Sequence, residues 1–166
     1  RRAEFEARIR KAGAWLAKQN PEGASDENWT LLGLFWSKAD ARRLSQSARQ
    51  ILQHQRADGG WAQLPGLASD AYATGQSLYA LATTGTLDTT SDTWKRGVDY
   101  LLKTQQADGT WHVKTRSFPF QPYFESGFPY GPDQWISAAG SSWATIALTM
   151  ADKESARSRE ALLRKP

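Results

Sequence analysis

Apolar residues recur at helical spacing along most of the chain. Over residues 1–19 they lie on one side of a helix, at Phe5, Ile9, Ala12 and Leu16. A similar segment at about 40–55 begins at Asp40, which can cap a helix, and its apolar face consists of Leu44, Ala48, Ile51 and Leu52. Residues 93–105 follow the same amphipathic pattern. These three segments predict helices with one face turned to solvent.

Between the amphipathic segments lie segments that are apolar nearly all round. The first begins near Ser25 and Asp26, either of which can cap a helix, and contains Trp29, Leu31, Leu32, Leu34, Phe35 and Trp36. Comparable segments cover 70–84 and about 137–151. Because a helix that is apolar on every side is typical of a buried position, the sequence predicts an all-α fold of outer and inner helices, without strands of consequence.

Two seven-residue segments fifty residues apart are nearly identical. The first reads Gln55-Arg56-Ala57-Asp58-Gly59-Gly60-Trp61, and the second reads Gln105-Gln106-Ala107-Asp108-Gly109-Thr110-Trp111. A weaker copy runs from Gln19 to Ser25. Asp-Gly supplies a turn, and the tryptophan is a large apolar plug. Repetition at a fixed period indicates a repeat architecture: one domain over residues 1–166, with repeats at about 1–39, 40–85 and 91–151. Residues 152–165 are expected to form the outer helix of a further repeat.

The second copy and the helix before it resemble the Gln-Trp repeat of the squalene-hopene and oxidosqualene cyclases. The positions that fit are Arg96-Gly97-Val98-Asp99-Tyr100-Leu101, Gln105, Gly109 and Trp111. The first copy departs at its start, at Ser47 and Gln50, and the protein prenyltransferase β-subunits carry a looser version. The resemblance covers nearly the whole chain. It implies about half of an α/α toroid, with two rings of helices around an apolar cavity, and a fragment of a larger protein; a fold alone implies no activity.

The cyclases that this chain resembles protonate an alkene with an Asp-x-Asp-Asp-Thr-Ala segment at the start of an inner helix. Here that segment aligns with residues 70–75, which keep Asp70 and Thr74 but place Tyr72 and Ala73 at the central acids. A tyrosine, with a pKa of about 10, is too weak an acid for this step. Protonation within this chain is therefore not expected, and Asp70 is expected to cap its helix.

The resembled prenyltransferases hold zinc with Asp, Cys and His, but this chain has no cysteine and only two histidines. We expect no metal and no cofactor. His54 is expected to be a solvated surface residue. His112 lies near Lys114 and Arg116, which could meet a phosphate, although a solvated loop is the simpler interpretation because no glycine nest or helix start accompanies them.

The loop 112–136 combines seven aromatic residues with four prolines, unlike a disordered linker. The loops between turn and inner helix lengthen along the chain, and in repeat proteins such insertions gather on one face, often the binding face. The aromatic rings need burial, either as a plug at the end of the half-ring or as the lining of an apolar cavity. The ligand-binding candidates are Asp70, Tyr72, Tyr123, Phe124, Phe128, Tyr130 and Trp135. Gln55, Asp58, Gly59, Trp61, Gln105, Asp108, Gly109 and Trp111 are expected to be structural.

Charge and composition exclude little else. The net charge of +4 comes from basic residues scattered over helix surfaces, so nucleic-acid binding is not expected. No apolar run reaches the length of a membrane span, and the composition does not indicate a compartment.

Three functional hypotheses remain: a module that binds an apolar or isoprenoid-like ligand, part of a cyclase-type isomerase whose acid lies outside this chain, and a protein-interaction scaffold. Inner helices that lack neighbours should also leave an apolar flank exposed and favour self-association or contact with the remainder of the parent protein. The residues expected on that flank are Trp29, Phe35, Trp36, Tyr79 and Trp143.

Overall fold

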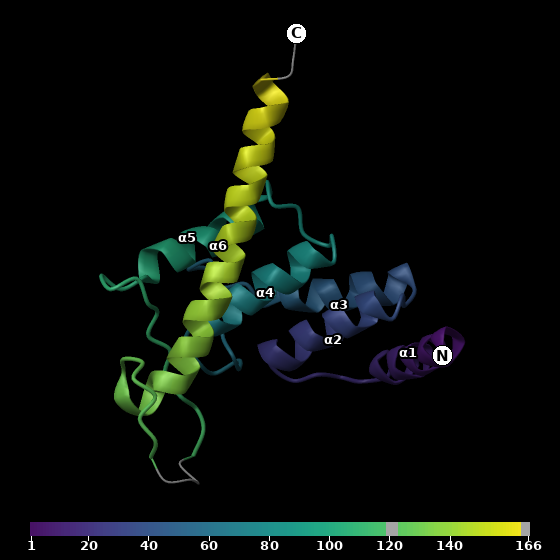
Figure 1. The fold of residues 1–166 in the computed structure, drawn as a ribbon, viewed down its shortest axis with the longest axis horizontal. Coiled ribbons are helices and arrows are strands. Elements are labelled where there is room, and N and C mark those ends of the chain that lie inside the picture. Colours follow the sequence, from purple (N-terminus) through teal and green to yellow (C-terminus); the bar gives the residue numbers. More distant parts are fainter. Residues whose placement is uncertain (119–122, 164–166) are drawn as a thin grey trace.

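The computed structural model of the protein describes residues 1–118 and 123–163, and side chains as far as Ala151. Within these residues the chain is helical (Figure 1), with the elements α1 Arg2–Leu16, α2 Ala24–Trp36, α3 Ala41–Gln53, α4 Ala71–Thr83, α5 Asp92–Thr104, the short 3-10 helix η1 Gly131–Asp133 and α6 Gln134–Leu163. The described part contains one isolated β-bridge, between Trp61 and Asp70. The predicted all-α class is confirmed. Residues 119–122 of the aromatic loop, among them Pro119, Phe120 and Pro122, lie outside the described residues.

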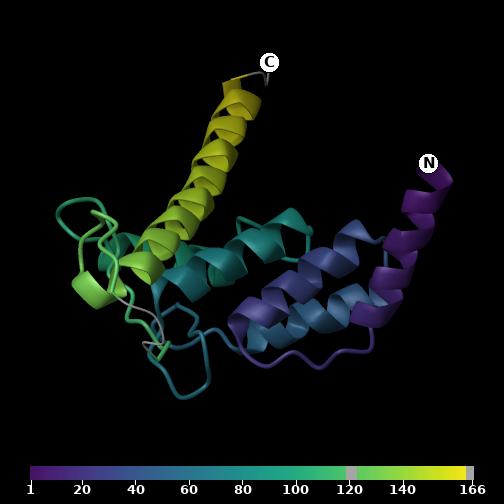
Figure 2. The same cartoon turned by 60° about the horizontal axis from the view of Figure 1, so that its bottom comes forward.

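The helices form a partial α/α toroid. α4 packs between α2 and α6, α3 packs against α2, α5 packs against α4, and α1 lies at the edge beside α2 (Figures 1 and 2). The core lies between the inner helices α2, α4 and α6 and the outer helices α3 and α5. Its fully buried side chains include Leu31, Leu34, Ile51, Leu78, Leu81 and Leu101. Among the described helices, none combines the length and apolar character that a bilayer crossing requires.

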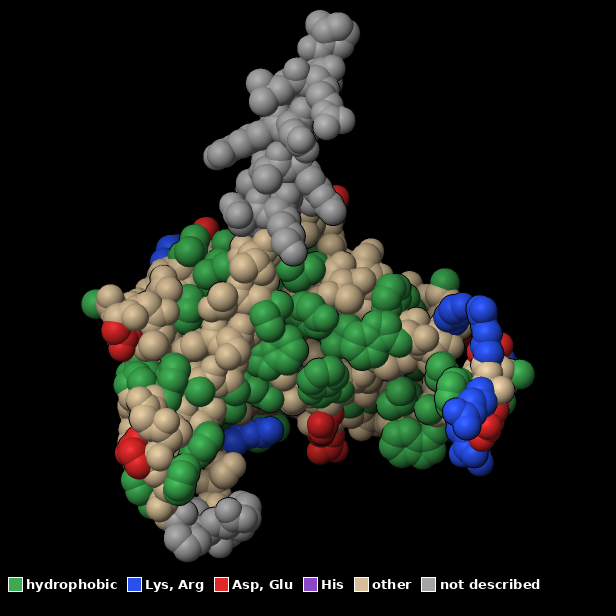
Figure 3. Space-filling view, in the orientation of Figure 1, with side chains coloured by type: hydrophobic (Ala, Val, Ile, Leu, Met, Phe, Trp, Pro, Cys, Tyr) green, Lys and Arg blue, Asp and Glu red, His purple; other side chains and the backbone are tan. Residues whose placement is uncertain are grey.

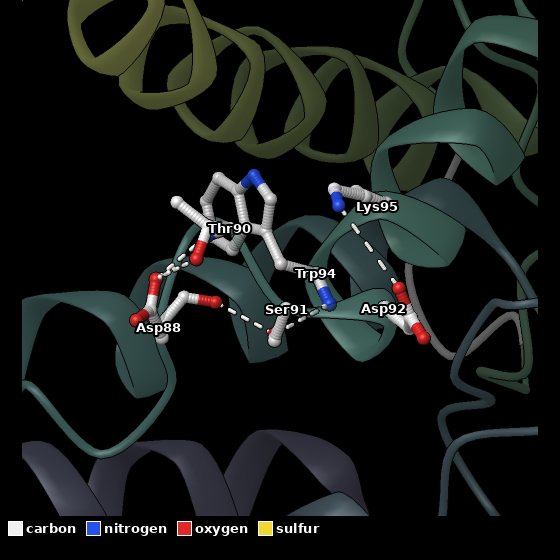
Figure 4. Close-up of polar contacts among 6 residues, drawn as sticks. All are labelled: Asp88, Thr90, Ser91, Asp92, Trp94 and Lys95. Carbon is white, nitrogen blue, oxygen red and sulfur yellow. Dashed lines mark hydrogen bonds and ion pairs between the residues drawn. The ribbon is translucent and has the colours of Figure 1, made fainter. Parts of the chain in front are cut away.

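Three helices begin with side-chain caps, and the sequence predicts two of them, Asp40 and Asp70. Asp40 accepts the amide of Arg43 at 2.9 Å, and Asp70 accepts that of Ala73 at 2.8 Å. Ser91 accepts the amide of Trp94, and Figure 4 shows this start of α5 together with its neighbouring contacts. These caps fix where α3, α4 and α5 begin.

The start of α2 differs from the prediction, because neither Ser25 nor Asp26 caps it. The N-cap is Gly23, at a φ of 93°, and the amide of Ala24 donates to the carbonyl of Gln63 at 3.1 Å. The loop of the next repeat therefore satisfies this helix end, and glycine permits the sharp turn.

Residues 152–163 do not form a separate outer helix, because they continue α6 without a break. No glycine or proline stands between Gly140 and the end of α6 to stop the helix. Its C-terminal part extends beyond the other helices (Figure 1).

The apolar stripe of α1 is only partly covered. Phe5, Ile9 and Trp15 are exposed, whereas Gly13 is buried where the helix passes close to Ser37. A helix at the edge of a repeat stack has a neighbour on one side alone, which accounts for this exposure.

Candidate functional site

The two Gln-Trp turns have the same internal hydrogen bonds. In the first, the side-chain amide of Gln55 donates to the backbone carbonyl of Gly59 at 2.9 Å. The carboxylate of Asp58 accepts a hydrogen bond from the backbone amide of Gly60 at 2.9 Å. The second turn repeats both bonds at 2.9 Å and 3.0 Å, through Gln105, Gly109, Asp108 and Thr110. In each turn the glycine has a positive φ, which only glycine adopts at little cost.

Each tryptophan of these turns is buried and hydrogen-bonded to the preceding helix. The indole of Trp61 donates to the carbonyl of Ile51 at 2.7 Å, and its backbone amide donates to the hydroxyl of Thr74 at 2.9 Å. Trp111 makes the equivalent bonds at 2.8 Å and 3.0 Å, to Leu101 and Ser141. Buried tryptophans with satisfied indoles pack and hold the turn, which supports a structural role.

Asp70 lies at the first loop and is mostly buried. Besides capping α4, its carboxylate accepts the side-chain amide of Gln63 at 2.9 Å. Burial raises the pKa of Asp70, although these hydrogen bonds and the charge of Arg116 oppose the rise. The charge of Arg116 reaches Asp70, so the loop that follows the second turn passes near the start of α4. The carboxylate of Asp70 already accepts hydrogen bonds from Ala73 and Gln63. A carboxylate held in this way as a helix cap is a poor proton donor.

Tyr72 occupies the place of the missing acid and is half-buried. Its hydroxyl lies 3.4 Å from the hydroxyl of Ser25, so the ring reaches from α4 toward α2. On the other side, a Cβ atom at Gly140 would lie 3.6 Å from the Cβ of Tyr72, which shows how closely α6 passes. Among the described residues, no hydrogen bond or ring contact joins Tyr72 to the aromatic loop.

The aromatic loop is held by polar side chains at the end of η1 and the start of α6. Gln134 is fully buried, and its amide donates to the hydroxyl of Tyr123 at 3.0 Å and to the carbonyl of Phe124 at 3.1 Å. Asp133 accepts the amide of Thr115 at 2.8 Å and contacts the ring of His112 at 2.8 Å. Sequence reasoning missed Gln134, because a buried glutamine beside a loop leaves no pattern.

The hydrogen bonds that anchor the loop also lower the pKa of Asp133. Burial alone would raise the pKa of Asp133, but the bonds from Thr115 and His112, with the charges of His112 and Lys114, hold it below the usual value. His112 also stacks on Tyr130, with ring centres 4.6 Å apart. His112 therefore has partners within the loop, and this geometry does not favour a phosphate site.

The loop rings contact each other more than the core. Phe124 stacks on Trp135 with ring centres 6.2 Å apart, and Phe128 lies 6.4 Å from Tyr130. The expectation that these rings need burial is wrong for Phe118, which is 88% exposed, and also for Tyr123, Phe124 and Trp135. Val113 packs into the core at the start of the loop, and polar anchors hold the described residues beyond it, so the exposed rings do not form a buried plug.

Three other rings meet on the inner face, where α2, α4 and α6 present side chains away from α3 and α5. Trp143 lies 6.0 Å from Trp29 in an edge contact and 5.4 Å from Tyr79. We call Trp29, Tyr79 and Trp143 the ring cluster. Figure 3 shows apolar side chains gathered over this face.

The apolar flank expected from the sequence is present on α2, where Trp29, Phe35 and Trp36 are all exposed. Tyr79 and Trp143 are half-buried because they meet each other. Self-association through this flank stays a prediction.

A shallow hollow of about 220 Å³ lies beside the loop after the first turn, and its lining includes His54, Arg56 and residues 62–65. No ligand-binding candidate lines it. His54 is not simply solvated, because its ring lies 3.1 Å from the buried carboxylate of Glu27.

These arrangements favour apolar contact over acid catalysis. The central acid positions hold Tyr72 and Ala73, and the remaining carboxyl, Asp70, is used as a cap. The inner face instead offers aromatic surface, which suits a hydrocarbon or a cation.

Comparison with protein families matches this chain to a known family. The model of the squalene-hopene cyclase N-terminal domain matches residues 2–97, from α1 into α5. The matched region is more than half of the chain and contains the first Gln-Trp turn, Asp70, Tyr72 and two residues of the ring cluster. A comparison with curated proteins found no match.

Proposed function

The chain belongs to the squalene-hopene cyclase N-terminal domain family, and from that membership we propose that its inner face binds an apolar, isoprenoid-like ligand without protonating it. The ring cluster is the observation that carries this proposal. Three inner helices each contribute one ring to a single accessible surface. Rings that are already in contact lose little side-chain entropy when a ligand covers them.

The energetic argument rests on exposed apolar area. Trp29 and Ile146 are exposed on the inner helices beside the half-buried Tyr79 and Trp143. Covering apolar surface yields about 25 cal/mol per Å². A long hydrocarbon chain gains this along its whole length, whereas a small polar molecule does not.

The candidates at the loop form the second part of the proposal, as the entrance to the inner face. Tyr72 and Asp70 lie at the start of α4, and Arg116 acts on Asp70 from the loop. The aromatic rings of the loop and of the first turn of α6 would meet the ligand before it reaches the ring cluster. Tyr123, Phe124 and Trp135 are exposed, and Phe128 and Tyr130 are half-buried.

A second function follows from the family alone, namely that the chain is part of a cyclase-type isomerase whose acid comes from elsewhere. The family match favours it, whereas Tyr72 and Ala73 at the acid positions do not. Under this alternative, Tyr72→Asp should still leave the isolated chain inactive, because the neighbouring acid would remain absent.

The test is titration with farnesene, an isoprenoid hydrocarbon, followed by tryptophan fluorescence. Trp143→Ala should weaken binding about tenfold or more, because a large apolar contact is lost. Trp15→Ala is the matched control, since Trp15 is exposed on the edge helix α1 and does not belong to the ring cluster. Equal affinity in both variants, or no binding by the unaltered chain, would refute the proposal.

A further inference from the structure

A buried glutamine lies beneath the ring cluster. Gln76 on α4 is 3% exposed. Thr74 and Ser141 occupy equivalent places on α4 and α6, because each accepts the backbone amide of a Gln-Trp tryptophan. Two residues further along, Gln76 and Trp143 are therefore equivalent as well.

Trp29 has the same place on α2, since it is the sixth residue of its helix, as Gln76 is of α4. α4 packs between α2 and α6. The rings of Trp29 and Trp143 lie 6.0 Å apart, and from this register we infer that they meet across α4 at the level of Gln76. This arrangement would place the two tryptophans over Gln76 and accounts for its burial.

Two buried side chains on α4 and α2 have a hydrogen-bond acceptor without a partner among the described residues. The side-chain oxygen of Gln76 is buried and has no hydrogen-bond partner among the described residues. The same holds for the side-chain oxygen of the buried Asn28, whose amide nitrogen donates to Ser77 at 3.1 Å. A buried carbonyl without a donor is costly, so such atoms call for an explanation.

We propose that the ring cluster and Gln76 together recognise an isoprenoid-type ligand whose end carries a hydrogen-bond donor, either a hydroxyl or an ammonium group. The chain of the ligand lies on the rings, and its donor reaches the oxygen of Gln76 when one tryptophan ring turns aside. This inference rests on the proposed function and adds the chemistry of the ligand's end.

The protein atoms without a hydrogen-bond partner determine whether the ligand group must donate or accept. Both oxygens, at Gln76 and Asn28, accept hydrogen bonds, so the complementary group donates. The faces of the surrounding rings also attract positive charge. A carboxylate or phosphate end would meet acceptors and ring faces, which repel it. A buried water molecule is the competing explanation for the same oxygens.

The experiment compares three ligands of the same carbon skeleton: farnesene, farnesol and farnesylamine. The unaltered chain should bind farnesol or farnesylamine about tenfold more tightly than farnesene, as expected for one buried hydrogen bond. Gln76→Leu should remove this preference and leave farnesene binding intact. The two polar ligands distinguish a hydroxyl from an ammonium group.

Gln76→Met is a second variant of closer shape, in case Gln76→Leu does not fold, and Gln53→Leu on the exposed side of α3 is the control. Equal affinity for all three ligands, or a preference that survives in the Gln76 variants, would overturn the inference while the proposed function stands. That result would assign the buried oxygens to water. If none of the three ligands binds, the proposed function fails and this inference fails with it.

Discussion

The two Gln-Trp turns are nearly identical inside and differ in what lies against them. The first turn is covered by the next outer helix: Gln55 also donates to the carbonyl of Thr93 at 2.8 Å and accepts a bond from Arg96 of α5. In the second turn, Gln105 is exposed, and its side chain donates to Gly109 alone among the described residues. Because the internal geometry is unchanged, the turn forms without its neighbour, and the neighbouring helix adds contacts to a finished structure.

The largest effect is expected from removing the tryptophans. Trp61→Ala and Trp111→Ala should each lower the free energy of unfolding by about 3–5 kcal/mol, because both rings are buried. Trp61→Ala should lie higher in that range, since the ring of Trp61 also packs near Gly97 of α5. Urea unfolding measures both, with the exposed Trp15→Ala as control. If Trp111→Ala unfolds like the unaltered chain, the second turn is not packed as described.

The glycines of the turns should separate the two environments more clearly. Gly59→Ala places a Cβ atom into the carbonyl of Arg96, and it also strains a φ of 89°. Gly109 has a similar φ of 85°, but a Cβ there meets nothing closer than Gln105 at 4.0 Å. We expect Gly109→Ala to cost about 1–2 kcal/mol from backbone strain. Gly59→Ala should cost more because α5 must also move.

Thermal unfolding by circular dichroism compares these glycine variants. Equal losses in the two would show that α5 yields at the first turn without cost, and that the covered turn is no tighter than the open one.

A smaller effect is expected at the glutamines. Gln55→Ala removes the contacts to Gly59, Thr93 and Arg96, so it should cost about 1–3 kcal/mol. Gln105→Ala removes a single bond at an exposed site and should cost about 0.5–1 kcal/mol. In a double-mutant cycle, Arg96→Ala should couple to Gln55→Ala and not to Gln105→Ala. Coupling to both would contradict the difference between the turns.

Local sequence signals predicted much of this fold. The helices expected at 40–55, 70–84 and 93–105 are observed at Ala41–Gln53, Ala71–Thr83 and Asp92–Thr104. Their starts depend on caps such as Asp40 and Asp70, which act within one turn of helix. Their ends coincide with the repeat turns or with Gly85, so the boundaries follow from nearby residues.

Features that depend on distant residues could not be predicted. The start of α2 is fixed by the carbonyl of Gln63, and the aromatic loop by the buried Gln134. The ring cluster joins three helices, and its position over Gln76 follows only from how they pack. No periodicity within one segment contains such contacts.

The smallest expected effect concerns an exposed carboxylate in the second turn. The hydroxyl of Thr110 donates to Asp108 at 2.7 Å and its amide at 3.0 Å, and these bonds lower the pKa of Asp108. The first turn has Gly60 at this place, and Asp58 takes a hydroxyl from Ser69 at 3.0 Å instead. Thr110→Val keeps the amide and removes the hydroxyl, so the pKa of Asp108 should rise toward its ordinary value.

Carboxyl titration by NMR measures this rise, with Ser69→Ala as the control that leaves the second turn intact. Because the pKa of Asp108 is lower in the folded chain than in the unfolded one, its carboxylate contributes stability above the unfolded pKa. That contribution is lost as the pH falls through the lowered folded value. The part of the Thr110→Val loss that comes from Asp108 should therefore be present at neutral pH and absent in acid. An unchanged pKa of Asp108 in Thr110→Val would mean that the backbone amide alone holds the carboxylate, and that the two turns do not differ in this respect.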